Sequence, residues 1–404
     1  MFQKLKDFYH LFQSLFANIY YGFPSRKLKV IGVTGTDGKT TTTHLIYHIL
    51  KSSGKKVSMV SSVYAHIAGR TYDTGFHVTT PDVFPLQHLL AESVEARDEY
   101  FVLETTSHAL SQNRVSFVDF QIGAITNITH EHLDFHKTYD NYVSAKVKLL
   151  QQADIVIANK DDASYPLLSR HLKQKILSYG MKQKADFNID LAHKLDENLA
   201  EFNRYNYLAA YAVCLTIGIP ADAILKALRT FVLPIGRYEI VVTEPVIAII
   251  DFAHTPNGIK AILSDVKKRF KTDKNRIIHV FGSAAKRDES KRPIMGEESG
   301  NYADTVILTE EDCRDENPEK IAREIARGLV KKGFTESDLI NKTEKSFCTL
   351  TNRKEAIDKA LQIANPGDII VLTGKGHEKS ICRGKIEYPW NEKKVLLESL
   401  KKKT

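Results

Sequence analysis

The segment from Val30 to Thr43 combines the pattern of a buried strand with residues that could hold a phosphate. Its sequence, VIGVTGTDGKTTTT, runs from apolar residues into a glycine-containing turn and then into a stretch compatible with a helix. Backbone N–H groups at such a turn point toward an anion, a lysine adds a charge for the β- and γ-phosphates, and the next hydroxyl can bind Mg²⁺. Lys39 and Thr40 occupy those two positions, although Val33 stands where the usual phosphate loop begins with glycine. The segment therefore predicts a nucleoside triphosphate site.

This loop belongs to a series of alternating strand and helix patterns. The predicted strands are Val30–Val33, Lys56–Val60, Tyr100–Leu103, Ile122–Thr126 and Asp154–Ala158. Such alternation predicts an α/β fold with a mostly parallel sheet, helices on both faces, and ligands beyond the carboxyl ends of the strands. Glu104 and Asn127 each follow a predicted strand, so we expect both beside the phosphate loop.

A second alternating unit begins at the apolar run Val246–Ile250, which stops at Asp251. Further strands are predicted at Ile277–Phe281, Thr305–Leu308 and Asp368–Leu372. Pro and Gly interrupt the pattern between residues 232 and 236, where we expect a hinge. The predicted organisation is an N-terminal helical segment (1–28), a central ATP-binding domain (29–234) and a Rossmann-like C-terminal domain (235–404).

The N-terminal segment carries apolar residues at helical spacing from Phe2 to Phe23, with Lys4 and Lys6 near its start. Two interpretations are open: a helix lying weakly on a membrane surface, or a helix packed on its own protein, which we favour. The chain shows no apolar run of membrane-spanning length and no cleavable leader pattern.

Net charge and cysteine content argue against a nucleic-acid-binding protein and against a disulfide-rich or zinc-binding one. The net charge of +8 is spread along the chain without the aromatic-interleaved basic motif of an RNA reader, so a polyanionic substrate such as a nucleotide is favoured over nucleic acid. The four cysteines show no paired spacing, which argues against a disulfide framework or a zinc knuckle and suits a reducing cytoplasm.

Ordered motifs carry a resemblance to a known family. They are TGTDGKTTT (34–42), TTPD (79–82), ETTSHALSQNRV (104–115), TNITHEHLDFH (126–136), YVSAK (142–146), FNRYN (202–206), GRYE (236–239), DFAHTP (251–256), KRDESKRP (286–293), TEEDCRDENP (309–318) and TGKGHE (373–378). In this order they resemble the ATP-dependent Mur ligases, and among them the branch that makes the UDP-muramyl tripeptide. The resemblance implies an amide-bond ligase of peptidoglycan precursor synthesis, which activates a muramyl-peptide carboxylate as an acyl phosphate and joins it to an amino acid.

The resemblance also implies roles for individual residues. The positions that match ATP contacts are Thr36, Gly38, Lys39, Thr40, Thr41, Asn206, Arg237, Asp251 and His254. Mg²⁺ would be held by Thr40, Glu104, His132 and a carbamylated Lys146. Of these residues, Lys39, Lys146, His132 and Arg237 are the implied catalytic groups. Carbamylation matters because it turns a lysine that would repel the metal into an anion.

Two further sets match substrate positions. For the muramyl-peptide acceptor they are Thr79, Thr80, Ser107, Gln112 and Arg114, and for the amino acid Arg287, Asp312, Arg314, Gly374 and Glu378. Arg314 could pair with the distal carboxylate of diaminopimelate and Glu378 with an ammonium. Asp312 adds a negative charge that could instead favour a basic amino acid such as lysine.

Three departures from the family leave alternatives open. Only about 28 residues precede the ATPase domain, fewer than the family's UDP-binding domain needs. Ala200 replaces a glycine, and Ser283-Ala284-Ala285 replaces a Cys-Gly-Gly turn. The chain could therefore be a Mur-type ligase for a non-UDP peptide or a polyglutamate acceptor, or a nucleotide-binding scaffold without catalysis. The scaffold would have no need for the implied catalytic set, and we expect an active, monomeric enzyme.

Overall fold

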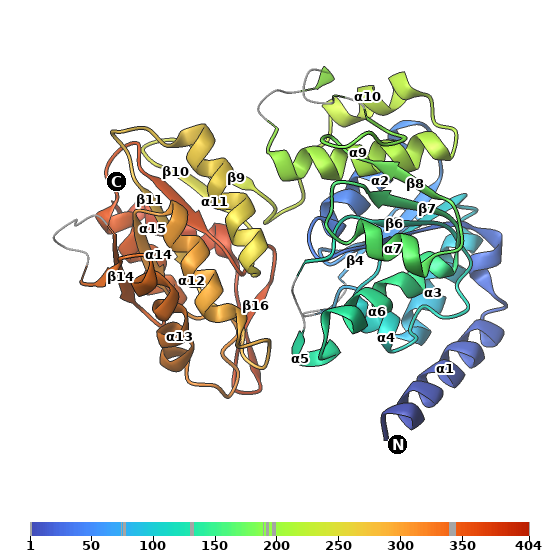
Figure 1. Ribbon diagram of the computed structural model, residues 1–404, viewed down its shortest axis with the longest axis horizontal. Helices are drawn as coiled ribbons and strands as arrows, with labels where there is room; N and C mark the ends of the chain where they lie inside the picture. The colour runs from blue at the N-terminus through green and yellow to red at the C-terminus, as the bar shows by residue number, and fades with distance from the viewer. Residues whose placement is uncertain are drawn as a thin grey trace. The chain divides into compact units, whose positions relative to one another are not determined.

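The computed structural model describes residues 2–73, 75, 78–129, 133–188, 190, 194–195, 199–338 and 345–403. Within it the chain forms two compact units, Met1–Val232 and Leu233–Thr404 (Figure 1). The division falls in the segment where Pro and Gly interrupt the sequence pattern. None of the described helices is long and apolar enough to cross a membrane.

Among its described residues, the first unit has an eight-stranded sheet in the order β4-β3-β2-β5-β1-β6-β7-β8. The strands are β1 (Lys29–Thr34), β2 (Val57–Val60), β3 (Ala65–Ile67), β4 (Arg70–Tyr72), β5 (Tyr100–Glu104), β6 (Phe120–Ile125), β7 (Ala153–Asn159) and β8 (Ile176–Tyr179). All neighbours pair in parallel except the antiparallel edge β2-β3-β4. The strand that leads into the phosphate loop, β1, therefore lies inside the sheet, as its continuous apolar run predicts.

Helices cover both faces of this sheet. The described helices of the unit are α1 (Phe2–Tyr20), which packs on α3, and η1 (Pro24–Lys27), α2 (Lys39–Ser52), α3 (Val83–Glu95), α4 (Ser107–Ser111), α5 (Leu133–His136), α6 (Tyr139–Gln151), α7 (Tyr165–His171), α9 (Glu201–Thr216) and α10 (Ala221–Arg229). Alternate residues of β1 divide between two cores. Ile31 and Val33 belong to a core shared with α2, α9 and α10, while Val30 belongs to one shared with α3.

The second unit repeats the plan, with a seven-stranded sheet in the order β13-β14-β12-β11-β15-β10-β9 among its described residues. The strands are β9 (Glu239–Val242), β10 (Ile247–Ile250), β11 (Ile277–Phe281), β12 (Thr305–Leu308), β13 (Thr335–Glu336), β14 (Ser346–Thr349) and β15 (Ile369–Leu372), followed by the separate hairpin β16 (Ser380–Arg383) and β17 (Ile386–Pro389). The helices are α11 (Pro256–Phe270), α12 (Lys291–Tyr302), α13 (Pro318–Lys331), α14 (Arg353–Ile363) and α15 (Glu392–Lys403).

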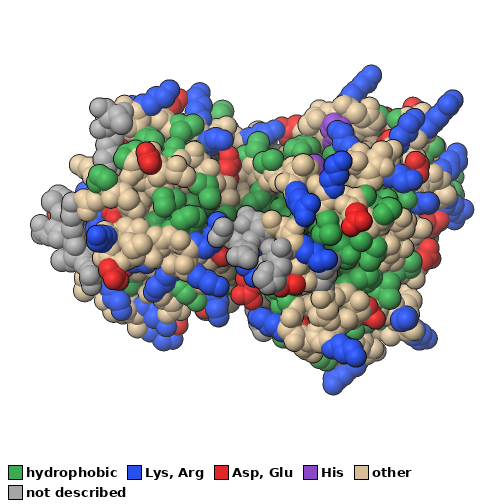
Figure 2. Space-filling model, turned by 90° about the horizontal axis from the view of Figure 1, so that it is seen from above, with side chains coloured by type: hydrophobic (Ala, Val, Ile, Leu, Met, Phe, Trp, Pro, Cys, Tyr) green, Lys and Arg blue, Asp and Glu red, His purple; other side chains and the backbone are tan. Residues whose placement is uncertain are grey.

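The predicted fold class, α/β with mostly parallel sheets, is confirmed. The sequence pattern missed short strands at the sheet edges, because strands of two to four partly exposed residues carry no continuous apolar run. On the face of the molecule drawn in Figure 2, Lys and Arg side chains are scattered over both units rather than gathered into one strip.

Candidate active site

Two glycines give the phosphate loop its shape. Gly35 has φ +149°, and a Cβ there would lie 1.8 Å from Thr126 Oγ1. Gly38 has φ +82° at the start of α2, and a Cβ there would lie 2.2 Å from Asn206 Oδ1. Both positions therefore exclude any side chain, and the second one brings Asn206 of α9 against the loop.

Residues after β6 hold the loop from the side. Asn127 accepts a hydrogen bond from the Asp37 amide (2.9 Å) and donates one to the Asp37 carbonyl (3.1 Å). Thr36 shares a hydrogen bond with the Tyr142 hydroxyl (3.0 Å), and Lys39 Nζ donates to the Thr36 carbonyl (2.7 Å). The loop is thus fixed by an amide, a hydroxyl and the Lys39 ammonium group.

A group of oxygen atoms converges beside the first turn of α2. The Glu104 carboxylate, at the end of β5 and almost fully buried, accepts from Thr40 Oγ1 (3.0 Å), Ser62 Oγ (2.9 Å) and the Ser62 amide (2.8 Å). Ser62 also lies 3.2 Å from Thr79 Oγ1. Carboxylate and hydroxyl oxygens are the ligands that Mg²⁺ prefers, so this set fits the ion.

Ser62 was missed by the sequence analysis. Its signal is a polar Ser61-Ser62 pair directly after the apolar strand β2, but only the parallel pairing of β2 with β5 brings it to Glu104. His132, the other predicted metal ligand, lies outside the described residues.

Lys146 is buried against the phosphate loop. It projects from α6, only 1% of its surface is exposed, and Nζ donates to the Gly35 carbonyl (2.6 Å) while lying 4.5 Å from the centre of the Tyr142 ring. This position beside the loop supports a functional rather than a solvated lysine.

Three of the predicted acceptor residues are brought together. Arg114 donates to the Thr80 carbonyl (3.1 Å) and to Gln112 Oε1 (2.8 Å), and it pairs with Asp82 (3.0 Å). Thr80 Oγ1 donates in turn to the Glu104 carbonyl (3.0 Å). The predicted acceptor positions therefore connect to the oxygen cluster through the backbone of β5.

The other two predicted acceptor residues are Thr79 and Ser107. Thr79 contacts the oxygen cluster through Ser62. Ser107 is buried at the start of α4, and its Oγ lies 3.1 Å from His136 Nε2.

In the second unit, the predicted nucleotide residues follow β10. Asp251 accepts hydrogen bonds from the amides of Tyr238 and Ala253, both at 2.7 Å. His254 Nδ1 donates to the Phe252 carbonyl (2.8 Å), which leaves Nε2 as an acceptor in the neutral ring. Burial, followed by the charge of Lys291, lowers the pKa of His254 to about 3, so the ring is neutral at physiological pH.

The predicted nucleotide residue Arg237, just before Tyr238, places its guanidinium 4.5 Å from the centre of the Phe252 ring.

The predicted amino-acid residues follow three neighbouring strands, β12, β11 and β15. Asp312 is buried, and its Oδ1 accepts from Lys375 Nζ (2.9 Å) and from the Cys382 amide (2.9 Å). Lys375 also pairs with Glu378. Asp312 is therefore paired with a cation within the protein, and that cation is Lys375, which Glu378 shares and which the sequence analysis did not single out.

Glu311, next to Asp312, is a buried carboxyl group. It is only 5% exposed, and its Oε2 has no hydrogen-bond partner among the described residues. Gly374, with φ +102°, faces it: a Cβ there would lie 2.9 Å from that oxygen. Burial, followed by the charge of Asp312, raises the pKa of Glu311 to about 7. The predicted pocket residue Gly374 is thus required by a carboxyl group that the sequence analysis did not consider.

Arg314 is partly exposed and adopts φ +46°, fixed by backbone hydrogen bonds to Cys382 and Gly384. The turn that replaces Cys-Gly-Gly is also anchored, because the Ala285 amide donates to the Asp312 carbonyl (2.8 Å). Arg287 lies in the loop that follows this turn, and it is partly exposed.

A fully buried arginine joins the loops after β12 and β15. Arg353 donates to the carbonyls of Glu310 (3.2 Å) and Thr373 (2.7 Å), and it pairs with Glu392 at 2.6 Å with neither side chain exposed. Arg383 pairs with Glu310 at 2.5 Å. Both arginines lie outside the recognised motifs, and nothing in the sequence shows that Arg353 pairs with Glu392 or Arg383 with Glu310.

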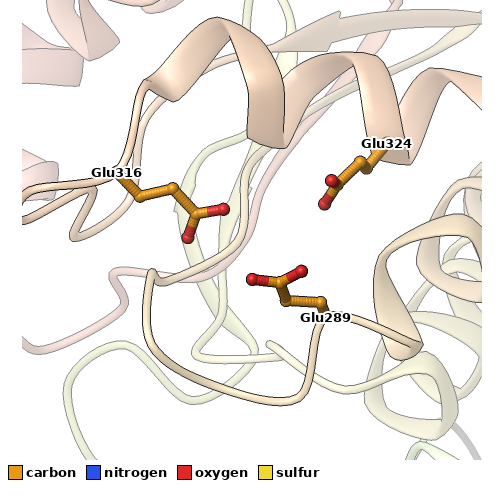
Figure 3. Close-up of side chains that lie close together, drawn as sticks. All are labelled: Glu289, Glu316 and Glu324. Atoms are coloured by element: carbon orange, nitrogen blue, oxygen red, sulfur yellow. The ribbon is translucent and has the colours of Figure 1, made fainter.

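Three carboxylates point toward one another: Glu289 from the loop before α12, Glu316 from the segment just before α13, and Glu324 from within α13 (Figure 3). Arg292 is completely buried and pairs with Glu316 (2.7 Å) and Glu324 (2.6 Å), and Lys320 lies within 4.0 Å of all three. The Arg292 guanidinium lowers the pKa of Glu316 to about 2. The cluster is therefore explained as an ion-pair network.

Comparison with known proteins identifies the family. The Mur ligase middle domain matches residues 33–214, and the Mur ligase glutamate ligase domain matches residues 236–376. The chain belongs to the Mur ligase family. It is therefore an ATP-dependent ligase, as the motif order implied.

Two relatives illustrate the similarity. The chain is 35% identical to UDP-N-acetylmuramoyl-L-alanyl-D-glutamate–2,6-diaminopimelate ligase 1 of Clostridium acetobutylicum, over 95% of this chain and 80% of the relative. It is also 35% identical, with the same coverage, to the corresponding ligase of Aquifex aeolicus.

Solved structures agree with this assignment. A 2,6-diaminopimelate ligase of the same name superposes with a TM-score of 0.58 at 26% identity, covering 93% of this chain and 79% of the other. Folylpolyglutamate synthase of Mycobacterium tuberculosis superposes with a TM-score of 0.69 at 14% identity, covering 90% and 92%. The second likeness shows a shared fold only.

Proposed function

We propose that this Mur ligase joins 2,6-diaminopimelate to the glutamyl carboxylate of a UDP-muramyl dipeptide. The relatives named for that reaction share about a third of their residues with nearly the whole chain. The observation that carries the choice of amino acid is the Asp312–Lys375 pair. Since Lys375 compensates Asp312, that carboxylate no longer argues against a substrate with a second carboxylate, and Arg314 remains in the same loop to bind it.

The chemistry follows from the arrangement of groups. The acceptor carboxylate attacks the γ-phosphate of ATP, ADP leaves, and an acyl phosphate forms. The amine of the second substrate then attacks the acyl carbon, inorganic phosphate leaves, and the amine loses a proton. Both steps gather negative charge on phosphate oxygens, which Lys39, the loop amides and Mg²⁺ would stabilise.

The oxygen cluster supports the Mg²⁺ site. Thr40 and Glu104 would hold the ion, Ser62 orients the carboxylate, and Mg²⁺ would supply positive charge for the transferring phosphate. We further propose that Lys146 is carbamylated, supported by its burial beside the loop. Intact mass measured at neutral pH should show the added CO₂, and an active enzyme with an unmodified lysine would contradict the carbamate.

The remaining predicted site residues keep their proposed roles. His132 would contact Mg²⁺, and Arg237, Asn206, Asp251 and His254 would contact ATP. The chain is proposed to act as a monomer in the cytoplasm, which suits its four free cysteines. Light scattering on the eluting protein tests the oligomeric state.

One assay tests the proposed reaction. ADP release is measured with diaminopimelate, lysine, ornithine or glutamate, each with UDP-muramyl dipeptide and with the muramyl dipeptide lacking UDP. We expect turnover to require diaminopimelate and the UDP-linked acceptor. Equal turnover with the UDP-free acceptor would show that the enzyme does not require UDP on its acceptor. Turnover with glutamate but with none of the other three amino acids would favour a polyglutamate ligase.

A further inference from the structure

The helix α1 packs on its own unit mainly through small and polar residues, and of its aromatic side chains Phe16 also contacts the unit, with its ring centre 6.2 Å from that of Phe84 in α3. Ser14, Ala17 and Asn18 are completely buried. Ser14 Oγ donates to the Ser116 carbonyl (2.7 Å), and Asn18 Nδ2 contacts the same oxygen (3.4 Å). A surface helix usually packs its large apolar side chains against the protein, whereas α1 buries two polar residues and an alanine there.

The opposite face of α1 carries large apolar side chains that helical periodicity places on one side, at positions 9, 12, 16, 19 and 20. Their exposed fractions are 59% for Tyr9, 62% for Phe12, 53% for Phe16, 57% for Ile19 and 70% for Tyr20. We call these five residues the aromatic row. Figure 1 shows α1 standing out from the rest of the first unit, with its N-terminal end directed away. An exposed apolar surface of this kind indicates a binding partner.

The size of the row argues against a second copy of the chain as that partner. An aromatic side chain buries about 150–250 Å², so the four aromatic side chains and Ile19, each a little more than half exposed, present at most roughly 600 Å². A stable protein interface buries about 800 Å² on each partner. The row alone falls short of that area.

Charge and residue type point to a lipid surface instead. Lys4 and Lys6 precede the row in the sequence, and the exposed Lys27 follows it in η1, next to Arg26, which pairs with Asp119 at 3.4 Å. The row begins and ends with tyrosine, a residue that prefers the boundary between headgroups and hydrocarbon, and has phenylalanine between. Cations flanking an aromatic helix face fit anionic headgroups around a shallow apolar insertion.

We propose that α1 lies in the headgroup region of a membrane containing anionic lipid, with the aromatic row inserted. This goes beyond the proposed function, because ligation uses none of these residues. The binding is peripheral and reversible, since one short helix face inserts.

The test uses the full chain and vesicles of phosphatidylcholine, with or without phosphatidylglycerol. We expect the parent to float with the phosphatidylglycerol vesicles and much less with pure phosphatidylcholine. Phe12→Ser/Ile19→Ser should weaken this binding roughly tenfold or more, because two apolar side chains no longer leave water. The matched control is Val330→Ser/Ile386→Ser, which removes two apolar residues of similar exposure from the second unit and should bind as the parent does.

A second variant guards against misfolding. Phe12→Trp keeps an aromatic residue, and its fluorescence should shift to shorter wavelength with anionic vesicles, beyond any change of the parent, which contains one Trp. Equal binding of both double variants, no binding by the parent, or self-association of the parent that Phe12→Ser/Ile19→Ser abolishes would each overturn the proposal.

Discussion

The phosphate region of the first unit and the amino-acid loops of the second each contain a buried carboxylate, but they hold it differently. Glu104 accepts from hydroxyls and an amide, which are neutral donors. Asp312 accepts from Lys375, which is charged. A carboxylate with neutral donors keeps its full charge for a cation, whereas one paired with lysine contributes mainly to the shape of the pocket.

The same contrast extends to stability. In the second unit, Arg353, Arg383 and Arg292 are each paired with carboxylates around the loops, and breaking a buried pair leaves a charge uncompensated. In the first unit, the loop is shaped by glycines and by hydrogen bonds in which lysines, amides and hydroxyls donate to backbone carbonyls or to neutral side chains. We therefore expect substitutions of the paired arginines in the second unit to affect folding as well as activity, and truncation of Lys39 in the phosphate loop to affect activity alone.

The largest expected effect is on folding of the second unit. Arg353→Met should lower the free energy of unfolding by about 3–5 kcal/mol, because it leaves Glu392 buried and unpaired and removes donors from two loop carbonyls. Urea denaturation measures the loss. Lys394→Met, which breaks the exposed pair with Glu398, is the control and should cost at most about 1 kcal/mol. If both variants lost a similar amount of unfolding free energy, the buried Arg353–Glu392 pair would not be the source of stability that we propose for the second unit.

Turnover should suffer most from Lys39→Ala. We expect kcat to fall by about a hundredfold or more, the range for removing a group that stabilises developing charge. The free energy of unfolding should change little, because Lys39 begins α2 outside both cores. Lys51→Ala, at the exposed end of the same helix, is the matched control. A kcat for Lys39→Ala within a few-fold of the control would refute the phosphate-loop assignment.

The pH dependence of stability tests the buried carboxyl group of Glu311 in the second unit. Glu311 has a pKa of about 7 in the folded chain, raised from 4.5, so between these values the folded state binds more protons than the unfolded state. Its contribution is fully present below pH 4.5 and is lost as the pH rises through 7.

Glu311→Gln should abolish that loss. Above pH 7 the variant should be more stable than the parent, by about 3 kcal/mol at most, and the difference should shrink as the pH falls. Urea denaturation from pH 4.5 to 8 measures it. Parallel pH profiles for the two proteins would show that the pKa of Glu311 is the same in the folded and unfolded states, which would contradict the raised value.

The sequence predicted the central strands because their burial on both faces requires continuous apolar runs, as in Ile277–Phe281 and Thr305–Leu308, which the structure reproduces. The phosphate loop was visible because its glycines and lysine are adjacent in the chain. Ser62 and Lys375 were not, because each acts through a partner 42 or 63 residues away. The helix α1 was predicted, but which face it buries was not, because helical spacing does not show which side contacts the protein.

The smallest expected effect is on the choice of amino acid. It tests whether Arg314 is available to the substrate in a pocket where Asp312 is already paired with Lys375. If Arg314 binds the distal carboxylate of diaminopimelate, kcat/KM should favour diaminopimelate over lysine, and Arg314→Ala should reduce that preference by about 1.5–3 kcal/mol, the range for a hydrogen bond to a charged group. Lys385→Ala, an exposed cation in the neighbouring hairpin, is the control and should leave the ratio unchanged. The paired state of Asp312 makes the expectation firm, since an unpaired carboxylate would repel the same substrate group. A parent that prefers lysine, or a ratio that Arg314→Ala does not change, would move the specificity to Glu311 and Glu378.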